Sequence, residues 1–155
     1  MKSNPKVIDT LNALLAEELT AVNQYMVHSK IYDDWGYARL HLLIKKRAID
    51  EIKHAEKLIG RILFLEGMPI VSELGKIHIG STVEVQLQDD LGAEQGAVNE
   101  YNAGIRVMIE AGDNGTAELL KAILKDEEAH LDWIQSQLDQ IAQMGAQNYL
   151  SMQVE

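Results

Sequence analysis

The 155-residue chain has no cysteine, only 2 prolines and few aromatic residues, which make up 5% of the sequence. The absence of cysteine excludes disulfides and metal sites with thiolate ligands. So few prolines and aromatic side chains favour long helices over sheets, and a hydrophobic content of 46% is enough for a substantial core. We therefore predict a single all-α domain over residues 1–155.

The sequence also lacks a long hydrophobic segment and an excess of positive charge. No apolar run reaches the roughly 18 residues that a membrane-spanning helix needs, and the N-terminus enters an amphipathic pattern instead of a signal peptide. Lys and Arg number 14 against 24 Asp and Glu, so the formal net charge is −10, which repels nucleic acid and anionic lipid and attracts cations. These features predict a cytoplasmic protein with no nucleic-acid or membrane partner.

What the sequence does contain is a Glu-x-x-His motif that occurs twice. Residues three apart lie on one face of a helix, so each copy can present a carboxylate oxygen and an imidazole nitrogen to one metal ion. A further glutamate precedes each copy by 33 residues, and the flanking residues repeat as well. The chain is therefore an internal duplication of a helix pair with an offset of 76 residues: Glu18, Glu51 and His54 in the first half, and Glu94, Glu127 and His130 in the second.

Apolar periodicity and helix-end signals predict helices over residues 5–35, 37–66, 82–111 and 114–144, with a short helix over 146–152. Gly67 and Pro69 should end the second helix, and the stretch from there to Gly80 has no helical pattern. A thirty-residue helix is about 45 Å long, a distance that fourteen extended residues can just span. The sequence therefore predicts a four-helix bundle with a long crossover that makes helices two and three parallel, and with the two helix pairs related by a pseudo-two-fold axis.

The six Glu and His residues of the duplicated set all fall on apolar helix faces, where an isolated ionised carboxylate is very unfavourable. Two divalent cations would supply four positive charges against the four carboxylates. Ligation by oxygen and imidazole suits iron or manganese better than structural zinc. One Glu plus Glu-x-x-His per helix pair is the pattern of di-metal sites in ferritin-like bundles. The sequence thus predicts a buried di-metal centre in a ferritin-like fold.

With these residues in place, the chain resembles the bacterioferritins over essentially its whole length. Residues 145–150 resemble the family's C-terminal signature, and residues 63–67 resemble the end of its second helix. The resemblance implies a di-iron site with terminal carboxylates, bridging carboxylates and one imidazole per iron, supplied respectively by Glu18 and Glu94, by Glu51 and Glu127, and by His54 and His130.

The same resemblance implies a ferroxidase that oxidises Fe(II) with O2 or H2O2 and stores the Fe(III) as mineral inside a hollow shell of about 24 subunits. Two alternatives stay open. The chain would otherwise be the non-haem subunit of a mixed shell in which another chain carries haem, or a di-iron peroxidase of the rubrerythrin type. The absence of cysteine for a rubredoxin-like centre disfavours the peroxidase.

Two positions depart from the family's pattern. Bacterioferritins bind haem between two subunits through a methionine one residue after the second-helix glutamate, and that position is Ile52 here. A hydrocarbon side chain cannot ligate iron, so we expect no haem in a homo-oligomer. Position 46, often a histidine that joins Asp50 in an inner-surface iron site in the family, is Lys46, which leaves Asp50 alone.

Several nearby residues have two interpretations. Asp50 and Asp126 precede the motif histidines by one turn, and they either orient those imidazoles or are solvated helical residues. Tyr25 and Trp133 lie close to the site by helical spacing. The resemblance implies that they are electron donors, and core packing is the alternative. The remaining histidines have no ligand partner at a useful spacing and are expected at the surface: His28, His41 and His78.

Overall fold

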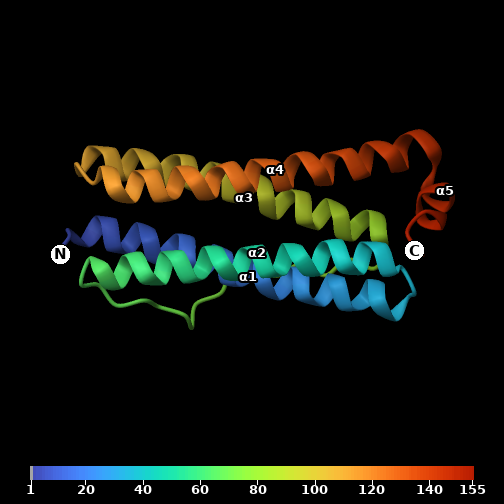
Figure 1. Cartoon of the computed structure of the whole chain (residues 1–155), viewed down its shortest axis with the longest axis horizontal. Coiled ribbons are helices and arrows are strands. Elements are labelled where there is room, and N and C mark those ends of the chain that lie inside the picture. The colour runs from blue at the N-terminus through green and yellow to red at the C-terminus, as the bar shows by residue number, and fades with distance from the viewer. Residues whose placement is uncertain (1) are drawn as a thin grey trace.

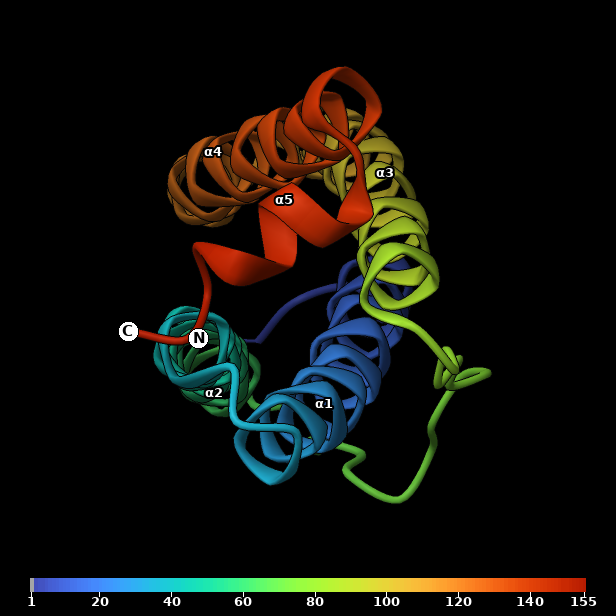
Figure 2. The same cartoon turned by 90° about the vertical axis from the view of Figure 1, so that its right-hand side faces the viewer.

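The computed structural model describes residues 2–155 and consists of four long helices and one short helix (Figure 1). Within these residues there is no β-strand. α1 is antiparallel to α2 and α3 to α4, and the two pairs pack face to face, with α5 across one end of the bundle (Figures 1 and 2). The predicted all-α four-helix bundle with a short C-terminal helix is confirmed. Its elements are α1 (Pro5–Asp34), α2 (Ala38–Phe64), α3 (Val83–Glu110), α4 (Asn114–Met144) and α5 (Ala146–Ser151).

Side-chain caps fix where three of the long helices begin. Asn4, Thr82 and Asp113 each accept a hydrogen bond from the backbone N–H three residues further on, at 2.9, 3.2 and 3.0 Å. Pro5 occupies the first turn of α1, where its missing N–H costs no helical hydrogen bond. The polar residues that precede these helices therefore satisfy backbone donors that the helices leave free.

The end of α2 differs in detail from the prediction. The residue in the left-handed conformation is Glu66, with φ of 61°, rather than Gly67. The N–H of Gly67 bonds to the carbonyl of Ile62 at 2.9 Å and closes the helix. Position 67 is also crowded, because a Cβ there would lie 2.7 Å from Cδ1 of Ile8, so that side chain would have to shift. The close packing of α1 against the helix end therefore favours glycine here, whereas the backbone conformation does not require it.

The crossover between α2 and α3 runs along the bundle beside α1, so that α2 and α3 are parallel as predicted (Figure 1). It forms no regular secondary structure. Its backbone N–H groups are instead bound by side chains on one face of α1, which explains how so long a segment keeps a defined course. The acceptors and their donors are Asn12 with Ile70, Thr20 with Gly75, Gln24 with His78 and His28 with Gly80, at 2.8, 2.8, 3.1 and 3.3 Å.

The expectation that His28 lies at the surface is wrong. Its side chain is completely buried, and Nδ1 lies 2.9 Å from Oδ1 of the equally buried Asp90 on α3. Nε2 accepts the N–H of Gly80, so Nδ1 is the ring nitrogen that donates to the Asp90 carboxylate. Gln24 donates to the same carboxylate oxygen at 2.9 Å. This network ties the crossover to both α1 and α3. His78 is exposed, as expected.

The bundle contains two hydrophobic clusters with a polar layer between them. On α1, buried residues of the first cluster end at Leu15 and those of the second begin at Tyr25, with Glu18 in between. The other three long helices are divided in the same way. The polar layer is therefore enclosed on both sides along the bundle axis. No helix in the described part of the chain is long and apolar enough to span a membrane.

Candidate metal centre

The polar layer at the middle of the bundle contains all six predicted ligand residues. None of them is more than 4% exposed. They form two overlapping groups, and within each group the ligand atoms lie within 4.8 Å of one another. One group is Glu18, Glu51, His54 and Glu127, and the other is Glu51, Glu94, Glu127 and His130.

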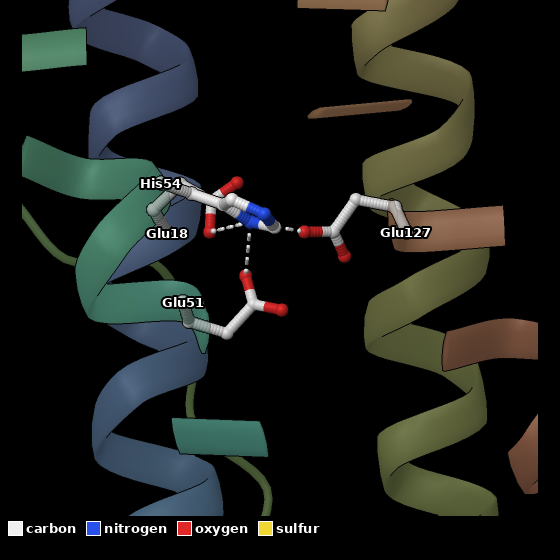
Figure 3. A group of neighbouring side chains, drawn as sticks. All are labelled: Glu18, Glu51, His54 and Glu127. Atoms are coloured by element: carbon white, nitrogen blue, oxygen red, sulfur yellow. Dashed lines mark ion pairs between the residues drawn. The ribbon is translucent and has the colours of Figure 1, made fainter. Parts of the chain in front are cut away.

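In the first group, Nδ1 of His54 faces three carboxylates (Figure 3). It lies 2.8 Å from Oε1 of Glu127, 3.5 Å from Oε2 of Glu51 and 3.6 Å from Oε2 of Glu18. Several of these atoms are buried without an aligned hydrogen bond among the described residues, including Nδ1 of His54 and Oε2 of Glu18. Converging lone pairs that do not satisfy one another are suited to a shared cation.

The second group repeats this arrangement around His130. Its Nδ1 lies 3.1 Å from Oε1 of Glu51, 3.5 Å from Oε1 of Glu94 and 3.7 Å from Oε2 of Glu127. Glu51 and Glu127 each direct one carboxylate oxygen toward His54 and the other toward His130. Both carboxylates therefore lie between two positions that could each hold a cation.

The outward-facing nitrogens of the two imidazoles meet aspartates from the opposite half of the chain. Nε2 of His54, on α2, lies 2.9 Å from Oδ2 of Asp126 on α4. Nε2 of His130, on α4, lies 3.4 Å from Oδ2 of Asp50 on α2. The two rings are stacked, with centroids 6.2 Å apart. A carboxylate that accepts the Nε2 proton turns Nδ1 toward the centre, where its lone pair can bind a cation once the ring has lost its second proton. The spacing along one helix suggested that each aspartate orients the histidine of its own motif. In the structure, each aspartate instead faces the histidine of the other motif.

Two buried tyrosines hold the remaining carboxylates. The hydroxyl of Tyr25, on α1, donates to Oε1 of Glu94 on α3. The hydroxyl of Tyr101, on α3, donates to Oε1 of Glu18 on α1 at 2.5 Å. Tyr101 was not predicted to be a site residue, although it is the repeat partner of Tyr25 at an offset of 76 residues. Both tyrosines therefore orient site carboxylates across the bundle.

The electrostatics of the centre favour positive charge. Burial, followed by the charge of Glu18, raises the pKa of Glu51 well above its usual range. Burial and the proximity of Glu127 raise the pKa of Glu94 to about 8. Burial opposes protonation of His130, but the carboxylates of Glu127, Glu51 and Glu94 outweigh it and raise its pKa to about 11. The metal-free centre therefore holds protons that a cation has to displace.

Known proteins resemble this chain in sequence along nearly its whole length. The ferritin family, described as a ferritin-like domain, matches residues 8–144. The bacterioferritin of Brucella melitensis is 40% identical over 149 residues, covering 96% of this chain and 92% of the relative. The bacterioferritin of Streptomyces coelicolor is 39% identical over 155 residues, covering 100% of this chain and 93% of the relative.

A third relative, the bacterioferritin of Mycobacterium tuberculosis, is 38% identical over 149 residues, which are 96% of this chain and 94% of the relative. This chain belongs to the bacterioferritins. Membership of this branch of the ferritin family supports iron storage as its function, and the two groups of buried carboxylates and imidazoles are compatible with a di-iron site.

Proposed function

We propose that this bacterioferritin is a ferroxidase that oxidises Fe(II) at the six-residue centre and stores the Fe(III) as mineral. The observation that carries this proposal is the sharing of Glu51 and Glu127 between two ligand groups. Two adjacent Fe(II) ions can together give two electrons to one oxidant molecule, either O2 or H2O2. Two isolated sites would not provide that pairing of electrons.

The two substrate ions would share some ligands and have others of their own. Glu51 and Glu127 would be shared by the two ions, because each has one oxygen near each imidazole. Each iron position also has one histidine and one carboxylate of its own, His54 with Glu18 and His130 with Glu94. The tyrosine hydroxyls that bond to Glu18 and Glu94 limit the rotation of those carboxylates. A centre held on four packed helices keeps its ligands in place before iron arrives.

For the assembly, we propose a cytoplasmic hollow shell of about 24 copies, by family likeness. An acidic interior would concentrate Fe(II) and nucleate mineral, which the net charge of −10 supports. A mixed shell is the second candidate, because Ile52 occupies the position at which bacterioferritins place their haem ligand. In that case this chain supplies ferroxidase sites and a second subunit carries haem.

Size and metal content of the purified protein test the proposal. We expect an assembly many times heavier than the 17.3 kDa chain, which takes up far more Fe than two atoms per chain when Fe(II) is added in air. A dimer that retains two metal ions per chain and accumulates no mineral would instead support a peroxidase and contradict storage. Co-purification of a second, haem-bearing chain would select the mixed shell.

A further inference from the structure

Three side-chain contacts follow one another along the seam between α2 and α4, next to the metal centre. The two helices are antiparallel (Figure 1), so residues with decreasing numbers on α2 lie opposite residues with increasing numbers on α4. The first two contacts are the aspartate–histidine pairs described above, and the third is a stack of an arginine on a tryptophan. In order, the pairs are His54 with Asp126, Asp50 with His130, and Arg47 with Trp133.

The third contact places a permanent cation on an indole ring. The guanidinium carbon of Arg47 lies over the ring of Trp133, 5.4 Å from its centroid, within the range of a cation–π interaction. Nε of Arg47 is buried and makes no hydrogen bond among the described residues. The buried part of the guanidinium is therefore held against the ring face instead of being committed to an acceptor through Nε.

Arg47 and Trp133 are each close in sequence to a residue of the metal centre. Trp133 follows His130 by three residues on α4, and Arg47 precedes Glu51 by one turn on α2. The indole is half-buried and packs against the hydrophobic cluster that includes Tyr25 and Ile134. Trp133 therefore lies about one helical turn from His130 along α4.

A cation on the ring face opposes oxidation of the ring. In the reduced state, the guanidinium is attracted to the negative face of the neutral indole. When a one-electron oxidant removes an electron, the ring becomes a radical cation, and the attraction turns into repulsion between two positive charges at short range. In a stepwise oxidation, in which the indole N–H proton leaves after the electron, loss of that proton cannot relieve this repulsion at the moment of electron transfer.

We propose that Arg47 protects Trp133 from one-electron oxidation by holding its guanidinium on the indole face, so that Trp133 is a poor electron donor during turnover. Arg47 acts as a positioning residue with an electrostatic effect and contacts neither iron nor oxidant. The relevance to turnover rests on the proposed ferroxidase function, whereas the altered redox behaviour of Trp133 does not. Trp133 would then lack the electron-donor role that family resemblance implies for it.

The test uses full-length protein without added iron, so that its outcome is independent of ferroxidase activity. The chain has 2 tryptophans, and Trp35→Phe leaves Trp133 as the only one. In this background, Trp133 is oxidised by photogenerated tris(bipyridine)ruthenium(III) complexes whose substituents give them a series of potentials. Arg47→Met removes the charge and keeps an unbranched stem, Arg47→Gln is a second neutral variant, and Arg47→Lys keeps a charge. Lys46→Met is the matched control, since it removes one charge from an exposed position on the same helix.

We expect Trp133 to be oxidised about tenfold faster in Arg47→Met and Arg47→Gln with the weakest oxidants, and the difference to shrink as oxidant potential rises. Arg47→Lys should stay nearer to the parent, and Lys46→Met should match it. Equal rates in the parent and the neutral variants would overturn the proposal. An equal increase with every oxidant, accompanied by greater quenching of Trp133 fluorescence by acrylamide, would also overturn it, because the arginine would then only shield the ring.

Discussion

The imidazole of His54 donates its Nε2 proton to Asp126 across 2.9 Å, and the two residues belong to opposite halves of a duplicated chain. Asp50 faces His130 in the reciprocal manner at 3.4 Å. Each half of the chain therefore sets the orientation and tautomer of an inward-facing imidazole in the other half. The duplication yields one centre that depends on both halves, and not two half-sites that work alone.

Replacing Asp126 by Ala should weaken binding of Co(II), a spectroscopic substitute for Fe(II), by about 10- to 100-fold, since His54 loses the acceptor that fixes its tautomer. Competition with a chelator of known affinity measures the change. Asp132→Ala is the matched control, because it removes an exposed carboxylate from the same helix. A similar loss of affinity in both variants would show that only overall charge matters and would contradict the orienting role.

Metal binding should strengthen with rising pH and release protons. Burial raises the pKa of Glu94 to about 8, and the surrounding carboxylates raise the pKa of His130 to about 11 against the opposing effect of burial. Both groups are therefore protonated in the metal-free centre at pH 7, and a cation has to displace those protons. Binding of Zn(II) followed with a pH indicator should release more than one proton per chain between about pH 6 and 8. Proton-neutral binding would count against these ligands.

The same shifts predict how the metal-free fold responds to pH. Both groups hold protons in the folded state that they lose more readily when unfolded, so their contribution to stability is present at low pH and declines as pH rises. The decline for Glu94 is complete above its folded pKa of about 8. We expect a lower melting temperature at pH 8.5 than at pH 6.5 without metal, and a smaller difference in Glu94→Gln. A melting temperature that rises over this interval would contradict the assignment.

Helical spacing explains why the convergence of the six Glu and His residues could be predicted. Glu51 with His54, and Glu127 with His130, share a helix face whatever the rest of the fold does, and the 76-residue repeat extends that argument to the remaining two glutamates. Contacts between helices are not determined by spacing along one helix. For that reason the exchange of the aspartates was not predicted, although their own repeat, like that of Tyr25 and Tyr101, was present in the sequence.

The burial of His28 also depends on contacts between separate segments, which the spacing along one helix does not predict. Its burial depends on Asp90, 62 residues away, and on the course of a crossover that has no periodicity. A lone histidine without a ligand partner on its own helix carries no signal of a partner on another. The crossover's length could be anticipated from the distance that it has to span, but the side chains of α1 that fasten it could not.

Replacing His28 by Ala should lower the unfolding free energy of the metal-free protein by about 2–4 kcal/mol, because the N–H of Gly80 and the carboxylate of Asp90 lose a buried partner. For a chain of this size, that is a fall in melting temperature of roughly 5–15 °C. His78→Ala is the control, since its side chain is exposed and its backbone N–H still reaches Gln24. Equal melting temperatures for the two variants would contradict a structural role for the His28 network.

The homo-oligomer should contain no haem. Ile52 is 44% exposed beside an apolar groove of about 370 Å³ between α1 and α2, whose walls include Met26 and Ile49. The groove has apolar walls, but Ile52 has no atom that can ligate iron.

After expression with ample haem we expect no Soret band from the parent, and a band from Ile52→Met, since the two side chains are similar in volume. Ile49→Met, which adds a thioether one turn away, should not produce it. A strong Soret band in the parent would contradict this and would point to Met26 as ligand.

The most direct test of the central claim is the stoichiometry of rapid Fe(II) oxidation, followed by stopped-flow absorbance as Fe(II) is increased. The claim predicts a fast phase that saturates at two Fe(II) per chain in the parent and in Glu128→Ala, which removes an exposed neighbour. Glu127→Ala, which removes a shared carboxylate, should slow that phase about a hundredfold or more. A fast phase that saturates at one Fe(II) per chain, or that survives unchanged in Glu127→Ala, would contradict a di-iron centre built on shared carboxylates.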